Sequence, residues 1–399
     1  MGQWPKIGFE TLPWHGDQEM APFISKTQRR KITSTYVAAV PLKIAELDVE
    51  IPGELSARMS ELLVRLAQFD TRQQARGYNL PAMLLRSESS ASSQIEHLTS
   101  SVRNVALAEL SGDVPNNAQL IAGNVDAMRE ALSLEEPLSV ETILKIHAAL
   151  INRGGASFGG QLRDEQVWVG GSPYSPHGAL YVPPRAELVP GYLDDLVAFA
   201  SRDDVSPLVK AAIVHAQLET IHPFIDGNGR TGRVLLHKVL ADEGVLRDVT
   251  LPVSAGLLHN ADAYMASITS YQQGDPVAVV EQLVEALDFA VAIGSLVAHR
   301  MDETFASWFE RIEERRGSSI YRLPGLLAEQ PVVSVSYVAN DLGITTRAAL
   351  TLVNRACEYG MLRPMGNKRR GDFYQADEII ELLEPVCDAA GLRRMVAGK

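Results

Sequence analysis

The sequence of 399 residues predicts a mainly α-helical protein with a small β-hairpin and a C-terminal winged helix-turn-helix domain. Apolar residues recur at helical spacing through most of residues 46–152 and 189–316. A segment rich in Gly, Pro and Ser, residues 153–190, separates these helical stretches. Residues 320–375 show another pattern, which predicts helix, helix, turn, helix and hairpin. We expect a chain of this length to form two or three domains.

The composition is typical of a soluble globular protein, with 46% hydrophobic and 22% charged residues. A net charge of −12 excludes a global basic surface for nucleic acid. The two cysteines, Cys357 and Cys387, form no CxxC pair, so neither a disulfide framework nor a zinc site is expected, and a cytoplasmic location fits best. MGQWPKIGFE lacks an apolar signal segment, and no apolar run is long enough for a bilayer, so no membrane association is expected.

The N-terminal region, residues 1–115, is predicted to be helical beyond residue 45. LSARMSELLVRLAQFD places apolar residues at helical spacing, and SGDVPNN predicts a loop at its end. A basic cluster near residue 28 is interpreted as a solvated face (Lys26, Arg29, Arg30, Lys31). The central region, residues 116–300, begins with further helices, one of which is predicted to start at Ser139 with Glu141 in its first turn.

The segment between the helical stretches contains two short extended runs, QVWVG and ALYVP. Glycine and proline bound both runs, so we expect a small β-hairpin that lies over the helical body. Trp168 in the first run either packs within this hairpin or contacts a target peptide, and packing is favoured.

The last region, residues 301–399, is predicted to hold a linking helix and the winged helix-turn-helix domain. Its turn is DLGITT, and its hairpin has the arms GMLRPM and GDFYQ around a GNKRR tip. Residues 320–375 contain seven basic and four acidic side chains, whereas the whole chain has a net charge of −12. Contact with DNA phosphates and contact with protein, including a homodimer, both remain open, and protein contact is favoured.

HPFIDGNGRTGR at residues 222–233 interrupts two helices, and its residue types suit a polyphosphate. Gly227 and Gly229 permit positive φ and a close backbone approach. Successive amides in such a turn, at a helix N-terminus, form an anion-binding nest. Arg230 and Arg233 are three residues apart, so both guanidinium groups are expected on one side of the first helical turn.

Two further side chains of this stretch indicate chemistry beyond anion binding. Asp226 is a carboxylate beside the expected phosphate site, where it is suited to hold Mg²⁺. His222 ends the preceding helix and is suited to act as a base. His215 and His237 lie on the flanking helices, and we interpret them as packing residues in preference to metal ligands. The phosphate-binding motifs GxxxxGK[ST] and GxGxxG after a strand are absent from the sequence.

HPFIDGNGRTGR resembles the Fic family motif HPFx[D/E]GNGRxxR at every specified position. The flanking segments are also similar to that family, because a helical core with QVWVGG and ALYVPP resembles the Fic fold with its β-hairpin flap. The resemblance covers roughly residues 46–300. It implies a nucleotidyltransferase that moves AMP from ATP to a Tyr, Ser or Thr hydroxyl of a protein, including its own, and releases pyrophosphate.

The resemblance assigns a role to each motif residue. His222 is implied as the base that takes the hydroxyl proton, and Asp226 as the residue that holds Mg²⁺. Asn228, with the amides around Gly227 and Gly229, is implied to bind the α-phosphate.

The remaining assignments concern the rest of the nucleotide. Arg230 and Arg233 are implied to bind the outer phosphates, and Phe224 to anchor the loop by burying its ring. Asn260 and Tyr264, in HNADAYMAS, resemble the residues on the adenine side of the family's site.

A second stretch, SSASSQIEHLTS at residues 89–100, resembles the inhibitory motif [S/T]xxxE[G/N] of some Fic proteins. Ser92 and Glu96 are four residues apart and share a helix face. His97 stands where the family has Gly or Asn. The resemblance implies that Glu96 pairs with Arg233 and prevents productive ATP binding. Removal of AMP, transfer of another phosphate-linked group, and a DNA-binding regulator that senses nucleotide remain the alternatives.

Overall fold

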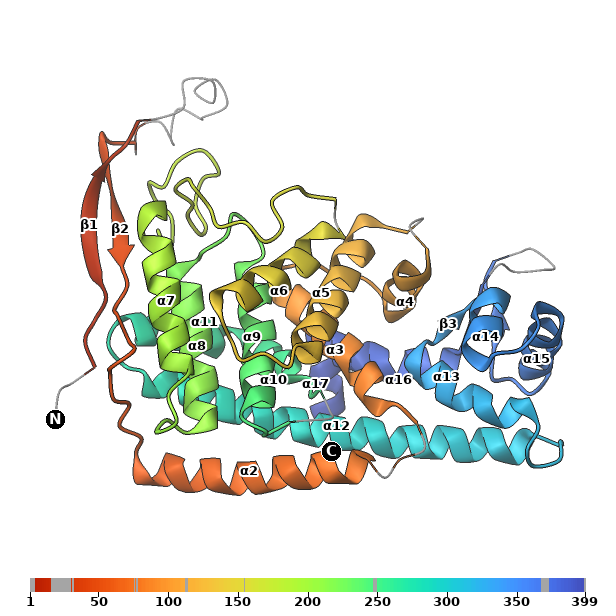
Figure 1. The fold of residues 1–399 in the computed structure, drawn as a ribbon. Helices are drawn as coiled ribbons and strands as arrows, with labels where there is room; N and C mark the ends of the chain where they lie inside the picture. Colours follow the sequence, from red (N-terminus) through yellow and green to blue (C-terminus); the bar gives the residue numbers. More distant parts are fainter. Residues whose placement is uncertain are drawn as a thin grey trace.

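The computed structural model describes residues 4–15, 30, 32–74, 76, 78–111, 114–153, 155–246, 250–366 and 373–397. The predicted fold class is confirmed, because helices dominate and the strands are few and short (Figure 1). The helices up to the functional loop are α2 (Gly53–Gln74), α3 (Leu80–Ile95), α4 (Val102–Leu110), α5 (Asn116–Ser133), α6 (Val140–Asn152), η2 (Ala186–Leu188), α7 (Val189–Ala200) and α8 (Pro207–Ile221). After it follow α9 (Asn228–Asp242), α10 (Val253–His259), α11 (Ala261–Gln272) and α12 (Val277–Arg311). Among the described residues, no helix is both long and apolar enough to cross a bilayer.

The centre of the molecule is the pair α8 and α9, which pack against each other. Nearly every residue of α8 is buried, because α7, α11 and α12 also pack on it. α12 has 35 residues and is therefore about 52 Å long. It runs without a break through residue 300, where the sequence analysis placed a domain boundary, and it contacts α2 along its outer side (Figure 1).

The N-terminal region contains a two-stranded sheet that the sequence analysis did not expect. β1 (Gly8–Pro13) pairs with β2 (Thr35–Val40) in antiparallel register, from Gly8 opposite Val40 to Pro13 opposite Thr35. This hairpin stands at the edge of the helical body (Figure 1). Of the predicted basic cluster, only Arg30 belongs to the described part, where it is exposed in a turn; the other three residues lie outside it.

The segment between α6 and α7 forms the predicted hairpin in a minimal version, and we call residues 163–184 the flap. Its two arms meet in one antiparallel bridge between Val169 and Tyr181. The indole of Trp168 donates to the carbonyl of Ser172 at 2.7 Å and lies edge-on to Trp14, with ring centroids 5.9 Å apart. Trp168 therefore packs within the flap and against the N-terminal hairpin.

The C-terminal region has the predicted order of elements. They are η3 (Ser319–Arg322), α13 (Leu323–Glu329), β3 (Val332–Val333), α14 (Val335–Leu342), α15 (Thr346–Glu358), β4 (Arg363–Pro364), β5 (Tyr374–Gln375), α16 (Asp377–Leu383), η4 (Glu384–Cys387) and α17 (Ala389–Ala397). Gly343, with φ of 64°, makes the turn between α14 and α15. The strands form an antiparallel sheet in the order β3, β5, β4, and the predicted basic tip between β4 and β5 lies outside the described residues.

α3 lies between the helical core and the C-terminal region. It contacts α5 and α10 of the helical core, and α13 and η4 of the C-terminal region. Every residue from Met83 to Ser93 is buried, although that segment is rich in serine. The side chain of Arg86 bonds Glu109 at 2.6 Å and also donates to the carbonyl of Glu329 in α13. Arg86 thus ties α3 to α4 and α13, whereas the hydroxyls of Ser89 and Ser93 have no hydrogen-bond partner among the described residues.

Candidate active site

The turn between α8 and α9 brings the predicted site residues together. His222 ends α8 by donating its amide to the carbonyl of Leu218 at 2.8 Å, and its own φ is 52°. A non-glycine residue rarely adopts this left-handed conformation, and a following proline restricts the backbone further. The strained backbone at His222 therefore marks a position that the surrounding structure has to hold in place.

Asn228 and Phe224 close the loop that follows His222. The side-chain oxygen of Asn228 accepts from the amide of Phe224, and its side-chain nitrogen donates to the carbonyl of Phe224, both at 2.9 Å. The ring of Phe224 is fully buried and stacks on His147, with ring centroids 3.6 Å apart. The Asn228 side chain is thus engaged within the loop, so its backbone amide is the group left for a phosphate.

His147 on α6 is a site residue that the sequence analysis missed. Its Nδ1 accepts from the amide of Gly160 and its Nε2 lies against the carbonyl of Asp226, both at 3.0 Å. Burial lowers the pKa of His147 to about 4, so the neutral ring donates through Nε2. The sequence KIHAALI predicts only that this histidine lies on an apolar helix face. Nothing in that pattern indicates a contact with a residue 79 positions away.

The start of α9 offers backbone and side-chain donors that suit an anion, and we call this place the anion site. Gly227, with φ of 83°, is the N-cap, so the first amides of α9 have no capping side chain. The side chain of Arg230 is buried, and its Nε and Nη1 find no hydrogen-bond partner among the described residues. Its Nη2 lies 3.3 Å from the carboxylate of Asp226. Buried donors without a partner are costly, which indicates that an anion belongs here.

Asp226 fits a Mg²⁺ ion only together with a phosphate. Its Oδ1 accepts from the amide of Gly227 at 2.6 Å, while the side chain stays 66% exposed. No group of three or more His, Cys, Asp and Glu side chains in the described ranges is arranged to hold a metal ion. Mg²⁺ commonly uses one or two carboxylates plus substrate phosphates and water, and one exposed carboxylate beside an anion site meets that need.

Arg233 is bonded to α3 through Nε and Nη2, while its Nη1 lies beside Gly229 at the start of α9. Its Nε donates to the hydroxyl of Ser92 at 2.9 Å, and its Nη2 donates to the carbonyl of Ser92 at 2.8 Å and to Oε1 of Glu96 at 3.0 Å. Glu96 Oε1 also lies 2.1 Å from where a Cβ on Gly229 would stand, so the carboxylate rests on the backbone of the anion site. Burial raises the pKa of Glu96, but Arg233 and Arg230 outweigh burial and hold it below its usual value.

His97 directly follows Glu96 and has φ of 61°. This conformation gives a physical reason for the Gly or Asn of the family motif, because those residues adopt positive φ most readily. Histidine is among the non-glycine residues enriched there, so the departure at His97 is compatible with the same helix ending.

A second contact fixes α3 two turns before Glu96. The buried carboxylate of Glu88 accepts from the amide of Ser254 at 2.7 Å and lies 2.9 Å from Nε2 of His237. Glu88, Ser92 and Glu96 follow each other at four-residue spacing and share one face of α3. The buried ring of His237 therefore lies against α3.

The two residues predicted on the adenine side occupy different environments. Asn260 is exposed where α10 meets α11. Tyr264 is buried, and its hydroxyl lies 2.9 Å from Nε2 of His215. Burial lowers the pKa of His215 to about 4, which keeps this stacked ring neutral. The role of Asn260 and Tyr264 toward adenine stays a prediction.

The ionisation of His222 is set by its surroundings. Burial and then the positive charge of Arg163 lower the pKa of His222 to about 4, against smaller opposing effects of Glu96 and Asp226. The ring is therefore neutral at pH 7, the form that accepts a proton.

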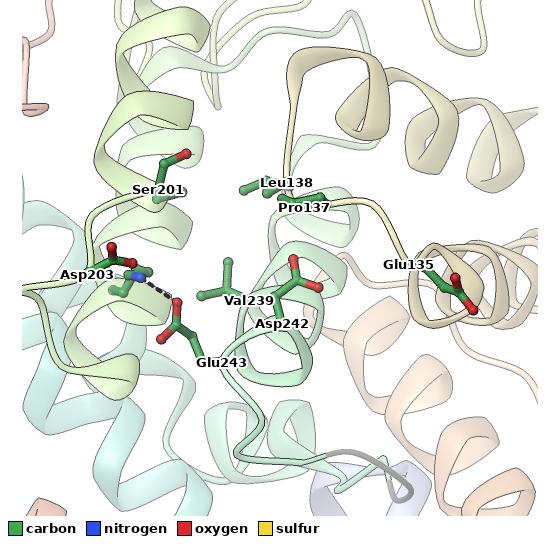
Figure 2. A pocket seen from close by; sticks show the side chains of 10 residues that line it. Glu135, Pro137, Leu138, Ser201, Asp203, Val239, Asp242 and Glu243 are labelled. Carbon is green, nitrogen blue, oxygen red and sulfur yellow. Dashed lines mark hydrogen bonds and ion pairs between the residues drawn. The ribbon is translucent and has the colours of Figure 1, made fainter.

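A separate pocket of about 390 Å³ lies at the other ends of α8 and α9, roughly 20 Å from His222 by helix length (Figure 2). Its polar lining is mainly acidic, and its buried Lys210 bonds Glu243. The residues around it are Glu135, Pro137, Leu138, Ala200, Ser201, Asp203, Lys210, Val239, Asp242 and Glu243. A lining with several carboxylates repels a triphosphate, so this pocket is no alternative to the α9 anion site.

Residues 137–240, which include α6 to α9 and the flap, match the family model of the Fic/DOC family. The chain carries a Fic/DOC domain. Protein adenylyltransferase fic-1 of Caenorhabditis elegans is 32% identical over 136 residues, or 33% of this chain and 25% of that protein. A probable protein adenylyltransferase of Aquifex aeolicus is 33% identical over 107 residues, or 27% of this chain and 31% of that protein.

The Fic domain matches only part of these relatives, since the aligned part of the chain spans about a quarter to a third of their lengths. A crystal structure of a Fic family protein from Desulfovibrio desulfuricans is 21% identical and aligns with a TM-score of 0.55, over 82% of this chain and 97% of that chain. This likeness shows a shared fold that extends beyond the Fic domain.

Proposed function

We propose that the chain is a protein adenylyltransferase that transfers AMP from ATP to a Tyr, Ser or Thr hydroxyl of a protein, its own side chains included. The unpartnered, buried nitrogens of Arg230 beside the uncapped start of α9 are the observation that most supports this proposal, because they need an anion. The matched relatives named protein adenylyltransferases favour a nucleotide as that anion.

The proposed reaction is a displacement at the α-phosphorus of ATP. The target hydroxyl oxygen forms a bond to that phosphorus, the bond to the bridging oxygen of the β-phosphate breaks, and pyrophosphate leaves. His222 takes the hydroxyl proton. A pKa of about 4 makes the free ring a weak base, and the negative charge of a bound triphosphate raises that pKa toward neutral pH. Phosphoryl-type transfer otherwise depends on positioning and charge neutralisation.

The other site residues are proposed to bind the metal ion, the phosphates and the target segment. Asp226 would hold Mg²⁺, which when bound neutralises phosphate charge. The amides of Gly227, Asn228 and Gly229 bind the α-phosphate, while Arg230 binds the outer phosphates. The flap positions the target segment next to His222.

The proposed enzyme is self-inhibited through Arg233. Two of the three guanidinium nitrogens of Arg233, Nε and Nη2, are bonded to Ser92 and Glu96, which leaves it fewer donors for a phosphate. The Glu96 carboxylate also rests on Gly229, where it repels an incoming phosphate. Both effects favour an ATP pose that does not lead to transfer.

The proposed reaction is tested with ATP labelled at the α-phosphate. We expect label on protein from the Glu96→Gly chain and none from the chain that also has His222→Ala, with a mass increase of one AMP on a defined hydroxyl. No label from either chain with any lysate protein would overturn the proposal. Loss of label from a pre-modified target would instead favour removal of AMP.

The C-terminal region is proposed to bind a partner through its helix-turn-helix. The outward face of α15 is polar, with Arg347, Thr351 and Asn354 exposed. Protein contact, including a homodimer, is favoured over DNA. A salt-dependent shift of a labelled DNA duplex by the full chain would reverse that preference.

A further inference from the structure

We propose that Arg163 is a positioning residue for the transfer reaction, because it joins His222 to both ends of the flap. This inference rests on the proposed function. The side chain of Arg163 contributes no contact to the anion site described above; it acts on the backbone around the base.

The contacts of Arg163 are unusual for a buried cation. Its residue exposure is 3%, yet it forms no ion pair with a carboxylate in the described part of the chain. Its Nε donates to the carbonyl of His222 at 2.8 Å and its Nη1 to the carbonyl of Glu165 at 3.0 Å. Its Nη2 donates to the carbonyl of Pro184. Because arginine offers five N–H donors in a fixed planar fork, one side chain can fix several carbonyls at once.

These bonds fall on a strained part of the backbone, next to His222. His222 has a positive φ directly before a proline, a conformation that persists only when its surroundings hold it. The side chain of Arg163 holds the carbonyl of His222, and its own amide donates to the carbonyl of Pro223 at 3.0 Å. Arg163 therefore holds two consecutive carbonyls, and without it the backbone has room to relax and displace the ring.

The same residue sets the distance between the base and the flap. Glu165 and Pro184 stand at the two ends of the flap, and both are bonded to Arg163. The hydroxyl of Tyr181 in the flap also donates to the carbonyl of Thr220 in α8 at 2.6 Å. These bonds thereby hold a target segment that the flap binds at a fixed position relative to His222.

Arg163 also affects the charge of the ring it positions. The groups that act on His222 are Arg163, Glu96, Asp226 and the backbone of Glu219. Burial and Arg163 favour the neutral ring, and the other three favour the protonated ring. Loss of the Arg163 charge is therefore expected to raise the pKa of His222.

The test compares Arg163→Lys and Arg163→Gln in the Glu96→Gly chain, with Arg202→Lys as the matched control. Arg202 also donates to backbone carbonyls, those of Ala45 and Leu47, but it lies near the other end of α8. Misplacement of a reacting group by about 1 Å costs about 10²-fold in rate, so we expect kcat to fall about 10²-fold in both Arg163 variants. KM for ATP should stay near the parent value, and the control should leave both constants unchanged.

A second readout separates positioning from folding and from the proposed function. NMR titration of ¹³C-labelled histidines, with His222→Asn to assign the signal, measures the pKa of His222 without catalysis. Arg163→Gln should raise the pKa of His222, whereas Arg163→Lys should leave it close to the parent value. If the glutamine variant does not fold, the lysine variant decides the kinetic test. An unchanged kcat, or equal losses in kcat and ATP affinity, would overturn the inference. If the parent transfers no AMP, the proposed function fails, and an unchanged pKa in Arg163→Gln then overturns the inference on its own.

Discussion

Replacement of Glu96 by Gly is expected to raise the rate of AMP transfer by about 5- to 30-fold. Glu96 contributes one of the three hydrogen bonds of Arg233 described above, and the two bonds to Ser92 remain. A hydrogen bond to a charged group is worth about 1.5–3 kcal/mol when buried. The Glu96 side chain is 41% exposed, so solvent screening leaves about 1–2 kcal/mol. That free energy changes the ratio of the inhibited to the competent state by about 5- to 30-fold.

The assay is the initial rate of label transfer from α-labelled ATP, with parent, Glu96→Gly and Glu96→Gln chains side by side. The Gln variant keeps the shape of the side chain and an acceptor for Arg233 but loses the charge, so its rate should lie between the other two. Because Arg233 holds the pKa of Glu96 below its usual value, the carboxylate is ionised at neutral pH. The contact is lost only as the pH falls through that lowered pKa, so the ratio of the rates should not change between pH 6 and 8.

The reasoning is refuted if the parent and the Glu96→Gly chain transfer AMP at the same rate while His222→Ala abolishes transfer in both. That result would mean that release of Arg233 from Glu96 limits neither ATP binding nor the reaction.

Three further predictions concern the elements that hold the site. His97→Val should increase basal transfer by up to about 30-fold, because a β-branched residue at positive φ costs about 1–2 kcal/mol at the end of α3. His97→Asn should leave the rate unchanged, and equal rates in both variants would contradict this. Burial lowers the pKa of His147, His215 and His222 to about 4, whereas these histidines titrate near 6.5 in the unfolded chain. Between about pH 6.5 and 4 the unfolded chain therefore binds more protons than the folded one, so the melting temperature should drop as the pH falls through this range. A calorimetric melting temperature that stays flat in this range would disprove the link. Phe224→Ala should lower the free energy of unfolding in urea by about 3–5 kcal/mol, because the ring is fully buried, and a loss below 1 kcal/mol would show that the ring does not anchor the loop.

Local sequence was sufficient to predict the elements whose signals are local. The helical spacing before and after HPFIDGNGRTGR predicted α8 and α9, and the glycines predicted the uncapped start of α9. The contact between Glu96 and Arg233 joins residues 137 positions apart. It was predicted from the resemblance alone, because periodicity shows which residues share a helix face but not which helices meet.

The residues that sequence reasoning missed are those whose partners lie far along the chain. Arg163 is one of several arginines in a loop, and its bond to a carbonyl 59 residues away leaves no pattern in the sequence. The role of Asn228 toward the α-phosphate came from the resemblance alone, which gave no sign that its side chain closes the loop on Phe224. The β1–β2 hairpin was missed because its strands are short, begin or end near Gly and Pro, and are joined by a long connection.

The position of α3 between the two regions has a consequence for cooperativity. Because α3 is buried by both regions, it is part of the hydrophobic core of each. If α3 unfolded together with one region, the other region would lose part of its own core. The helical core and the C-terminal region should therefore unfold in a single calorimetric transition, although the chain is long enough for two. Shortening the chain after α12 would remove one side of that shared core and lower the melting temperature of what remains.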